Sequence, residues 1–154
     1  MRYDADLAIK KAIAVLRKYN TRNPWLLGRC LPNVVVTPND LGENILGYTI
    51  TDRKFSIINI NAQTDEATSN SVLSHEIGHA LLTRNTGANY FYRNARVAAV
   101  GSDEFIANCF MFQFMFGNRG LINPMNRNKI LADYGLPRWM DRYFDLIDQE
   151  DPDD

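Results

Sequence analysis

The sequence has little of several features that define large protein classes. It contains only two cysteines among 154 residues, too few for a disulfide framework, so we expect Cys30 and Cys109 to be buried free thiols in a reducing compartment. No apolar run approaches the roughly 18–20 residues that a membrane-spanning helix needs, and no basic segment followed by an apolar one opens the chain. We therefore expect a soluble, cytoplasmic protein without a membrane partner.

Excess charge of either sign is also lacking. The formal net charge is −1 and no long run of Lys or Arg forms a basic patch, which argues against nucleic acid as a direct partner. A DNA-binding regulator is the competing interpretation, because Ile130 to Ile147 reads as helix, glycine-containing turn and helix. From residue 123 onwards, however, four Lys and Arg stand against eight Asp and Glu, and 4 − 8 gives a charge of −4. Such a segment repels phosphates.

Length and composition limit the chain to one folded unit. With 154 residues, 45% of them hydrophobic, it can bury one core but hardly two. We expect a single domain over residues 1–147 and a disordered acidic tail over 148–154.

The spacing of the apolar residues predicts an α+β fold. A first helix, capped by Asp4 and ending near Tyr19, buries a stripe made of Leu7, Ala8, Ala12, Ile13 and Leu16. Strands are expected at 34–37, ended by Pro38, and at 45–50 and 55–60, which form a hairpin. Further helices are expected from a cap at Thr68 or Ser69 to Leu82, at 102–116 before Gly117, at 124–134 after Asn123, and from Pro137. These elements predict a small three- to four-stranded, mostly antiparallel sheet packed on the two central helices, with additional helices at both ends.

Histidine is also scarce, and its placement points to chemistry. Both histidines of the chain lie in the segment from His75 to His79, which reads His-Glu-Ile-Gly-His. Residues four apart on a helix project from one face, so the two imidazoles can bind one ion with Glu76 beside its open side. The alternative is an amphipathic helix with two half-buried histidines. The spacing favours a zinc-dependent hydrolase.

A catalytic zinc site needs a third protein ligand, and no third histidine exists. Glu104 is the favoured candidate because it starts the second buried helix, and Asp103 is its neighbouring alternative. Either carboxylate could instead serve only as a favourable charge at a helix N-terminus.

Three segments resemble the ImmA/IrrE metallopeptidases. They are the His75 segment with the Ala-Leu-Leu that follows it, Glu-Phe-Ile-Ala-Asn-Cys-Phe from Glu104, and the preceding strand Ile-Ile-Asn-Ile-Asn from Ile57. The resemblance covers roughly Gly47 to Phe116 and is weaker beyond it. Thr83 stands where many members carry another histidine, and the ending Met-Phe-Gly after the second helix also departs from the family pattern.

The resemblance implies that His75, His79 and Glu104 bind Zn²⁺ and that Glu76 is the general base of an endopeptidase. Asn108 follows Glu104 by one helical turn, and we expect its amide oxygen to accept a hydrogen bond from the outer ring nitrogen of His75. Oxyanion donors remain open among Tyr90, Tyr92, Arg93 and Arg96, expected on a loop between the two helices.

The family suggests a protein substrate, a helix-turn-helix repressor of a phage or mobile element. We expect the substrate peptide to pair with the strand Phe55 to Ile60. The phenylalanines at 110, 112, 114 and 116 are interpreted as core rather than as a specificity pocket. A non-proteolytic zinc-fold protein that regulates a partner by binding is the alternative, and the sequence predicts no oligomeric state.

Overall fold

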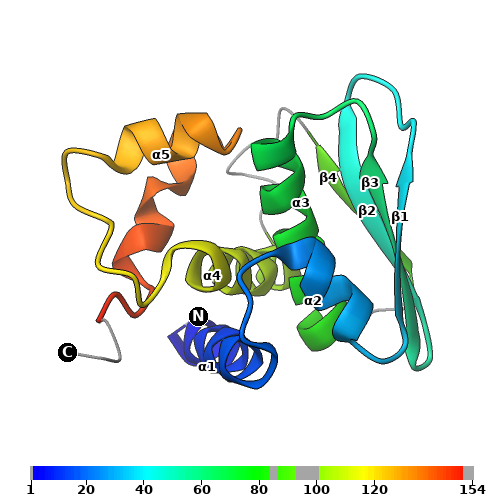
Figure 1. The fold of residues 1–154 in the computed structure, drawn as a ribbon, viewed down its shortest axis with the longest axis horizontal. Coiled ribbons are helices and arrows are strands. Elements are labelled where there is room, and N and C mark those ends of the chain that lie inside the picture. Colours follow the sequence, from blue (N-terminus) through cyan, green and yellow to red (C-terminus); the bar gives the residue numbers. More distant parts are fainter. Residues whose placement is uncertain (1, 84–86, 93–100, 151–154) are drawn as a thin grey trace.

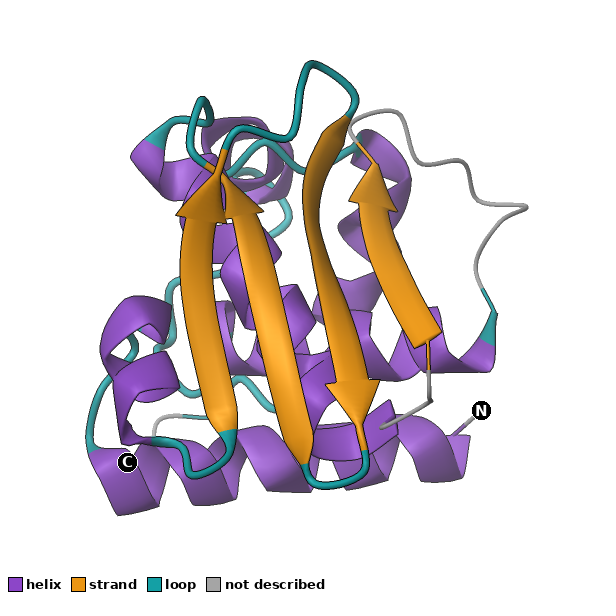
Figure 2. Ribbon diagram, turned by 90° about the vertical axis from the view of Figure 1, so that its right-hand side faces the viewer, coloured by secondary structure: helices purple, strands orange, loops and turns teal. Residues whose placement is uncertain are grey.

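A computed structural model describes residues 2–83, 87–92 and 101–150. It contains a four-stranded sheet in the order β1-β3-β2-β4. The strands are β1 (Val34–Asn39), β2 (Ile45–Asp52), β3 (Phe55–Asn61) and β4 (Gly87–Tyr92). Only β1 and β3 are parallel, and the other two pairs are antiparallel. Figure 2 shows the helices gathered behind one face of this sheet. The predicted α+β class with a mostly antiparallel sheet is confirmed.

Two details of the sheet differ from the prediction. Pro38 does not end β1 but pairs with Ile60 inside it; β1 is an edge strand, where a residue without an N–H is tolerated. Tyr90 and Tyr92 were expected on a loop, but they belong to β4, which pairs with β2. The hairpin of β2 and β3 is confirmed.

The His-Glu helix lies against the sheet. It comprises α3 (Glu66–Gly78) and continues without a break as the π-helical turn η1 (His79–Thr83). The expected caps Thr68 and Ser69 are wrong, because the Asp65 carboxylate accepts the backbone N–H of Thr68 at 2.9 Å. Thr68 is the residue that receives the cap, and its own hydroxyl also donates to Asp65 at 2.9 Å.

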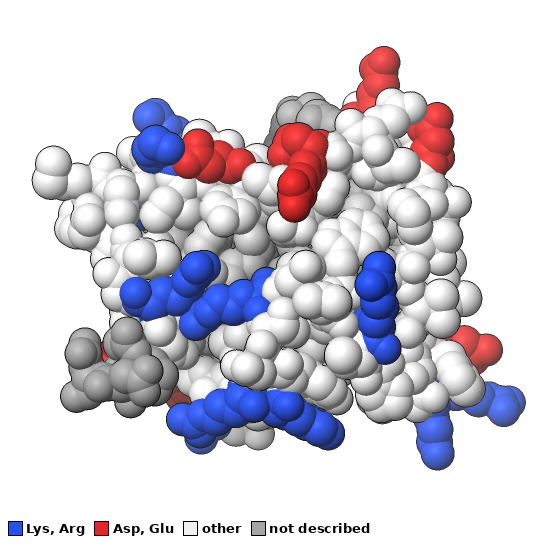
Figure 3. Space-filling view, in the orientation of Figure 1, with Lys and Arg blue, Asp and Glu red and all other residues white. Residues whose placement is uncertain are grey.

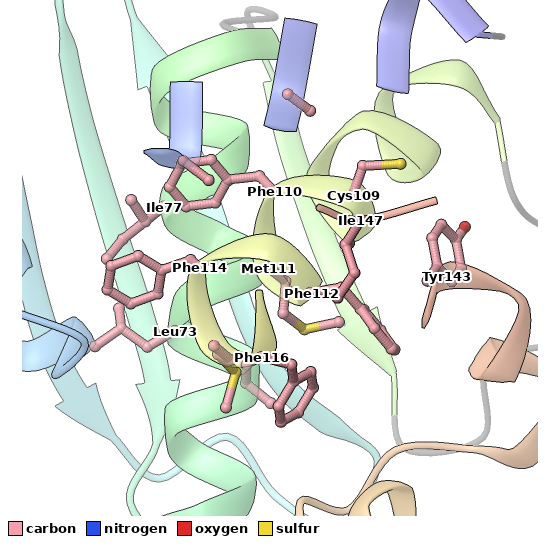
Figure 4. Close-up of a cluster of buried hydrophobic side chains, with 14 of the residues drawn as sticks. Leu73, Ile77, Cys109, Phe110, Met111, Phe112, Phe114, Phe116, Tyr143 and Ile147 are labelled. Carbon is pink, nitrogen blue, oxygen red and sulfur yellow. The ribbon is translucent and has the colours of Figure 1, made fainter. Parts of the chain in front are cut away.

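The second predicted helix, α4 (Ser102–Phe116), has the expected bounds and is followed by Gly117 as its C-cap. It lies between α3 and α1 (Arg2–Tyr19), as Figure 1 shows. The side chains of Leu73 and Ile77 on α3 meet Phe110 and Phe114 of α4 in the core drawn in Figure 4. The phenylalanines at 110, 112, 114 and 116 are all buried, which confirms that they are core and not a specificity pocket.

The first helix begins earlier and faces the core differently than predicted. Asp4 lies in the first turn of α1 instead of capping it. Leu7 is 44% exposed, and the buried residues of the helix are Ala5, Ala8, Ile9, Ala12 and Val15. Small side chains allow α1 to approach α4 closely, so the alanines decide which face is buried. Helix α1 is followed by a short helix that was not predicted, α2 (Pro24–Cys30), which the Asn23 side chain caps.

The C-terminal part forms shorter helices than predicted. Asn123 and Pro124 belong to a turn, and α5 (Arg127–Asp133) starts only after Asn126. Arg138–Asp145, or η3, is a 3₁₀ helix that follows Pro137. Asp148, where a disordered tail was expected to begin, is hydrogen-bonded to Gln113: its backbone N–H donates to Oε1 at 2.7 Å, and its carbonyl oxygen accepts from Nε2 at 3.1 Å. Residues 151–154 lie outside the described residues.

Surface features complete the fold. Cys109 is buried as expected, but Cys30, the last residue of α2, is exposed. On the face in Figure 3, Lys and Arg gather over α1 and near the middle, and most acidic side chains lie along the upper edge. None of the described helices is long and apolar enough to cross a membrane.

Candidate metal centre

The site lies where α3 runs into η1 beside the start of α4. A Cβ built on Gly78 would lie 3.1 Å from the Ala107 Cα and 3.2 Å from the Ala107 carbonyl oxygen. Because both neighbouring atoms are backbone, neither can move without separating the helices. Glycine at 78 therefore permits the close contact that brings Glu104, one turn before Ala107, to the two histidines.

Three ligating groups converge at this crossing. His75 Nε2 lies 3.1 Å from Glu104 Oε2, and His79 Nε2 lies 2.8 Å from Glu104 Oε1. The two Nε2 atoms are 3.1 Å apart. Both histidines are buried, whereas the Glu104 side chain is 30% exposed. The site therefore reaches solvent on the Glu104 side.

The spacing and chemistry of these atoms fit a small divalent cation. Two atoms that each lie about 2.1 Å from one tetrahedral ion are about 3.4 Å apart, close to the observed separations. Two imidazoles and one carboxylate form a donor set typical of catalytic zinc sites with one open position. The cluster of candidate ligands identified among the described residues consists of His75, His79 and Glu104, without the alternative Asp103.

The histidines hold Glu104 in its ionised form. Burial alone would raise the pKa of the Glu104 carboxyl. His75 and His79 lower this pKa well below its usual range, through their charge and through the hydrogen bonds that they donate to the carboxylate. An ionised carboxylate is the form that binds a metal ion.

Glu76 occupies a different environment beside the ligands. Its side chain is fully buried, and this burial raises the pKa of the carboxyl to about 8, although His79 and a hydrogen bond from Thr49 act in the opposite direction. The hydroxyl of Thr49 on β2 donates to Glu76 Oε2. The other oxygen, Oε1, is buried without a hydrogen-bond partner. Glu76 thus has one anchored oxygen and one free to accept a proton.

The two histidine rings are positioned by different neighbours. The His75 ring packs edge-on against Phe91 of β4, with ring centroids 4.7 Å apart. The His79 ring instead places Nδ1 2.9 Å from the hydroxyl oxygen of Thr83. Sequence reasoning missed Thr49, Thr83 and Phe91. Of the three, only Thr83 carried a local signal, because it lies one helical turn after His79.

The expected contact between Asn108 and His75 is not among the hydrogen bonds of the described residues. The Asn108 amide donates instead to the Tyr143 hydroxyl at 3.1 Å. Asn108 Oδ1 and His75 Nδ1 are both buried and without partners. The amide nitrogen of Asn108 is thus engaged by Tyr143, and its amide oxygen remains available to accept a hydrogen bond.

Other expectations concern the surroundings of the site. The strand Phe55 to Ile60 cannot offer a free edge to substrate, because β3 is paired with β1 on one side and β2 on the other. Tyr90 and Tyr92 belong to β4, but their side chains, like Arg93 and Arg96, lie outside the described residues. The oxyanion donor therefore stays an open prediction.

Comparisons with known proteins agree with this geometry. The family model Peptidase_M78, described as IrrE N-terminal-like domain, matches residues 31–142. The chain is 32% identical over 108 residues to "Uncharacterized immunity region protein 2" of Bacillus phage phi105, covering 70% of this chain and 67% of that protein. No solved structure matches. The matched range includes the whole cluster of His75, His79 and Glu104, and the chain belongs to the Peptidase_M78 family of ImmA/IrrE-like proteins.

Proposed function

We propose that this protein is a zinc-dependent endopeptidase. The observation that carries the proposal is the pairing of three converging ligands with a buried Glu76 whose Oε1 has no partner. A purely structural zinc site has four protein ligands and no use for a base beside it. Membership of a peptidase family supports the same reaction class.

The chain's own groups account for proton transfer and orientation. A zinc ion, when bound, supplies Lewis-acid polarisation of the peptide carbonyl and lowers the pKa of a water molecule. Glu76 accepts the proton of the attacking water at Oε1 and later delivers it to the leaving amine. Thr49 holds the other carboxylate oxygen, so Glu76 presents one oxygen in a fixed direction. His75, His79 and Glu104 bind the ion.

The substrate edge is assigned to β4 in place of β3. In the described sheet β4 is an edge strand, and its Phe91 packs against the ligand His75. An extended peptide that adds to such an edge gains backbone hydrogen bonds and lies beside the metal ligands.

The proposed substrate is a cytoplasmic helix-turn-helix repressor of a phage or mobile element. The support is the name of the relative, an immunity region protein of a Bacillus phage, together with the family to which the chain belongs. Cleavage of the repressor would release the genes that it blocks.

The test uses purified zinc-loaded protein and the repressor encoded nearest to its gene, with products identified by intact-mass spectrometry. We expect the native protein to cut the repressor at a defined bond and Glu76→Gln to lose at least about 100-fold in rate. Equal zinc content in both proteins is the control. Cleavage that survives in Glu76→Gln would contradict the proposed mechanism.

The second candidate function is regulation by binding alone. It is favoured only if Glu76→Gln, unable to cleave, still relieves repression in cells to the native extent. The same variant therefore separates the two functions.

A further inference from the structure

We propose that Thr83 is a positioning residue that holds the His79 ring with Nε2 directed at the metal. This inference rests on the proposed metal centre but concerns a contact that exists in the protein itself. His79 Nδ1 and Thr83 Oγ1 are 2.9 Å apart, and the remaining ring nitrogen, Nε2, faces Glu104 at 2.8 Å.

The direction of this hydrogen bond follows from the single proton of the threonine hydroxyl. Thr83 Oγ1 also donates to the backbone carbonyl oxygen of His79 at 3.2 Å. Because that carbonyl can only accept, it takes the hydroxyl proton, and Oγ1 is left to accept from the ring. His79 must then carry a proton on Nδ1. With a metal ion bound, Nε2 would give its lone pair to the ion in place of its hydrogen bond to Glu104.

Local backbone geometry makes the contact possible. His79 and Thr83 are the first and last residues of the π-helical turn η1, and such turns are often found at functional sites. The ligand is almost fully buried and Thr83 is half-buried. Few waters can therefore replace the hydroxyl.

The other ligand provides an internal comparison. His75 Nδ1 is buried and has no partner among the described groups, and the ring is oriented by packing on Phe91. Removing the Thr83 hydroxyl should therefore perturb one histidine and leave the other as a reference. Thr83 takes the position of the ring partner that an outer carboxylate or carbonyl supplies in many zinc sites.

The experiment exploits the fact that the chain contains only two histidines. Native protein, Thr83→Val and Thr83→Ser are loaded with zinc, and the ring nitrogens and their protons are observed by ¹⁵N–¹H NMR. Zinc affinity is measured in parallel by competition with a chromophoric chelator. Valine matches the shape of threonine without the hydroxyl, and serine keeps the hydroxyl.

We expect a protected Nδ1–H proton on His79 in the native protein and in Thr83→Ser. In Thr83→Val this proton should shift and exchange faster with water, and zinc affinity should fall about 10-fold, the lower end for loss of an outer partner. The His75 signals should not move. An unchanged His79 proton or an unchanged affinity in Thr83→Val would overturn the assignment.

Failure of this inference is distinct from failure of the proposed function. If all three proteins bind zinc equally well, Thr83 has no positioning role and the peptidase proposal stands. If the folded native protein binds no zinc at all, the metal centre itself is wrong, and the assignment to Thr83 fails with it.

Discussion

At the scale of single residues, the site holds two carboxyl groups whose pKa values are shifted in opposite directions. Burial raises the pKa of Glu76 to about 8. Burial would also raise the pKa of Glu104, but its two histidine partners lower that pKa below its usual range. One group is poised to exchange a proton near neutral pH and the other to stay ionised. This division suits a base and a ligand.

The raised pKa of Glu76 predicts how the stability of the metal-free protein depends on pH. Between about 4.5 and about 8 the native state keeps a proton on Glu76 that the unfolded state releases. The free energy of unfolding should therefore fall as pH rises through this window, by at most about 1.4 kcal/mol per pH unit. Urea denaturation with a chelator at several pH values between 5 and 8 measures this slope.

Glu76→Gln is the control, because glutamine has the shape of the carboxyl without its titration. The variant should lose the Glu76 part of the slope and be more stable than native protein at pH 8. Glu104 does not interfere, since its lowered pKa affects stability only in more acidic solution. Parallel curves for the two proteins would show that Glu76 is not held in its protonated form.

The hydrogen bond from Thr49 to Glu76 predicts a second effect. Thr49→Val removes the hydroxyl and should lower kcat about 10-fold, a fraction of what a general base contributes, while zinc content stays unchanged. Without this bond, which lowers the pKa of Glu76, the acid limb of the pH–rate profile should move to higher pH.

Thr51→Val is the matched control for this prediction. Thr51 lies two residues further along β2 and is also buried, but its hydroxyl contacts Ser56 at 3.0 Å. The control should cleave substrate at the native rate. Equal rates for Thr49→Val and Thr51→Val would rule out an orienting role for Thr49.

The candidate ligands were predictable because His75 and His79 lie at helical spacing and because the segment that starts at Glu104 resembles a family motif. Thr49 was not, because it reaches Glu76 across 27 residues of sequence and a threonine in a strand carries no chemical signal. Asn108 lies on the expected helix, but its bond to Tyr143 depends on how η3 packs. Local patterns in a single sequence do not reveal contacts between segments that lie far apart in the chain.

At the scale of secondary structure elements, the approach of α3 to α4 decides whether the site forms. We expect Gly78→Ala to separate the helices and to lower the free energy of unfolding by about 1–3 kcal/mol through overpacking. Because Glu104 then moves away from the histidines, zinc binding should lose more free energy than folding does. Thermal unfolding and zinc titration of the same samples measure both effects.

Gly101→Ala serves as the control for the glycine substitution. A Cβ at Gly101, next to the start of α4, would meet no atom within 4 Å. This variant should keep native stability and zinc affinity. A Gly78→Ala protein that binds zinc like the control would show that the close crossing is not required.

Element prediction succeeded where periodicity was strong and failed where packing decides. The hairpin and α4 had alternating or dense apolar patterns with clear ends. The edge strand β4 did not, since its place depends on pairing with β2. The signal for α2 was present in Asn23 and Pro24, a cap and first-turn pair. For α1, the burial of Ala8 and Ala12 was predicted, but Leu7 is exposed and the buried Ile9 and Val15 were missed.

At the scale of the whole molecule, the sheet, α3 and α4 form a frame that brings the candidate ligands together. Their ligating atoms lie within 4.8 Å of one another. A site of this kind should bind zinc without global refolding. A metal that binds only the native state also stabilises the protein.

The most direct test of the account is zinc bound per chain, measured by elemental analysis for native protein, Glu104→Ala and Asp103→Ala, each shown to be folded by circular dichroism. We predict about one zinc in the native protein and in Asp103→Ala, and little or none in Glu104→Ala. Loss of zinc in Asp103→Ala but not in Glu104→Ala would show that Asp103, and not Glu104, is the third ligand. A folded native protein that takes up no zinc after reconstitution would contradict the metallopeptidase account as a whole.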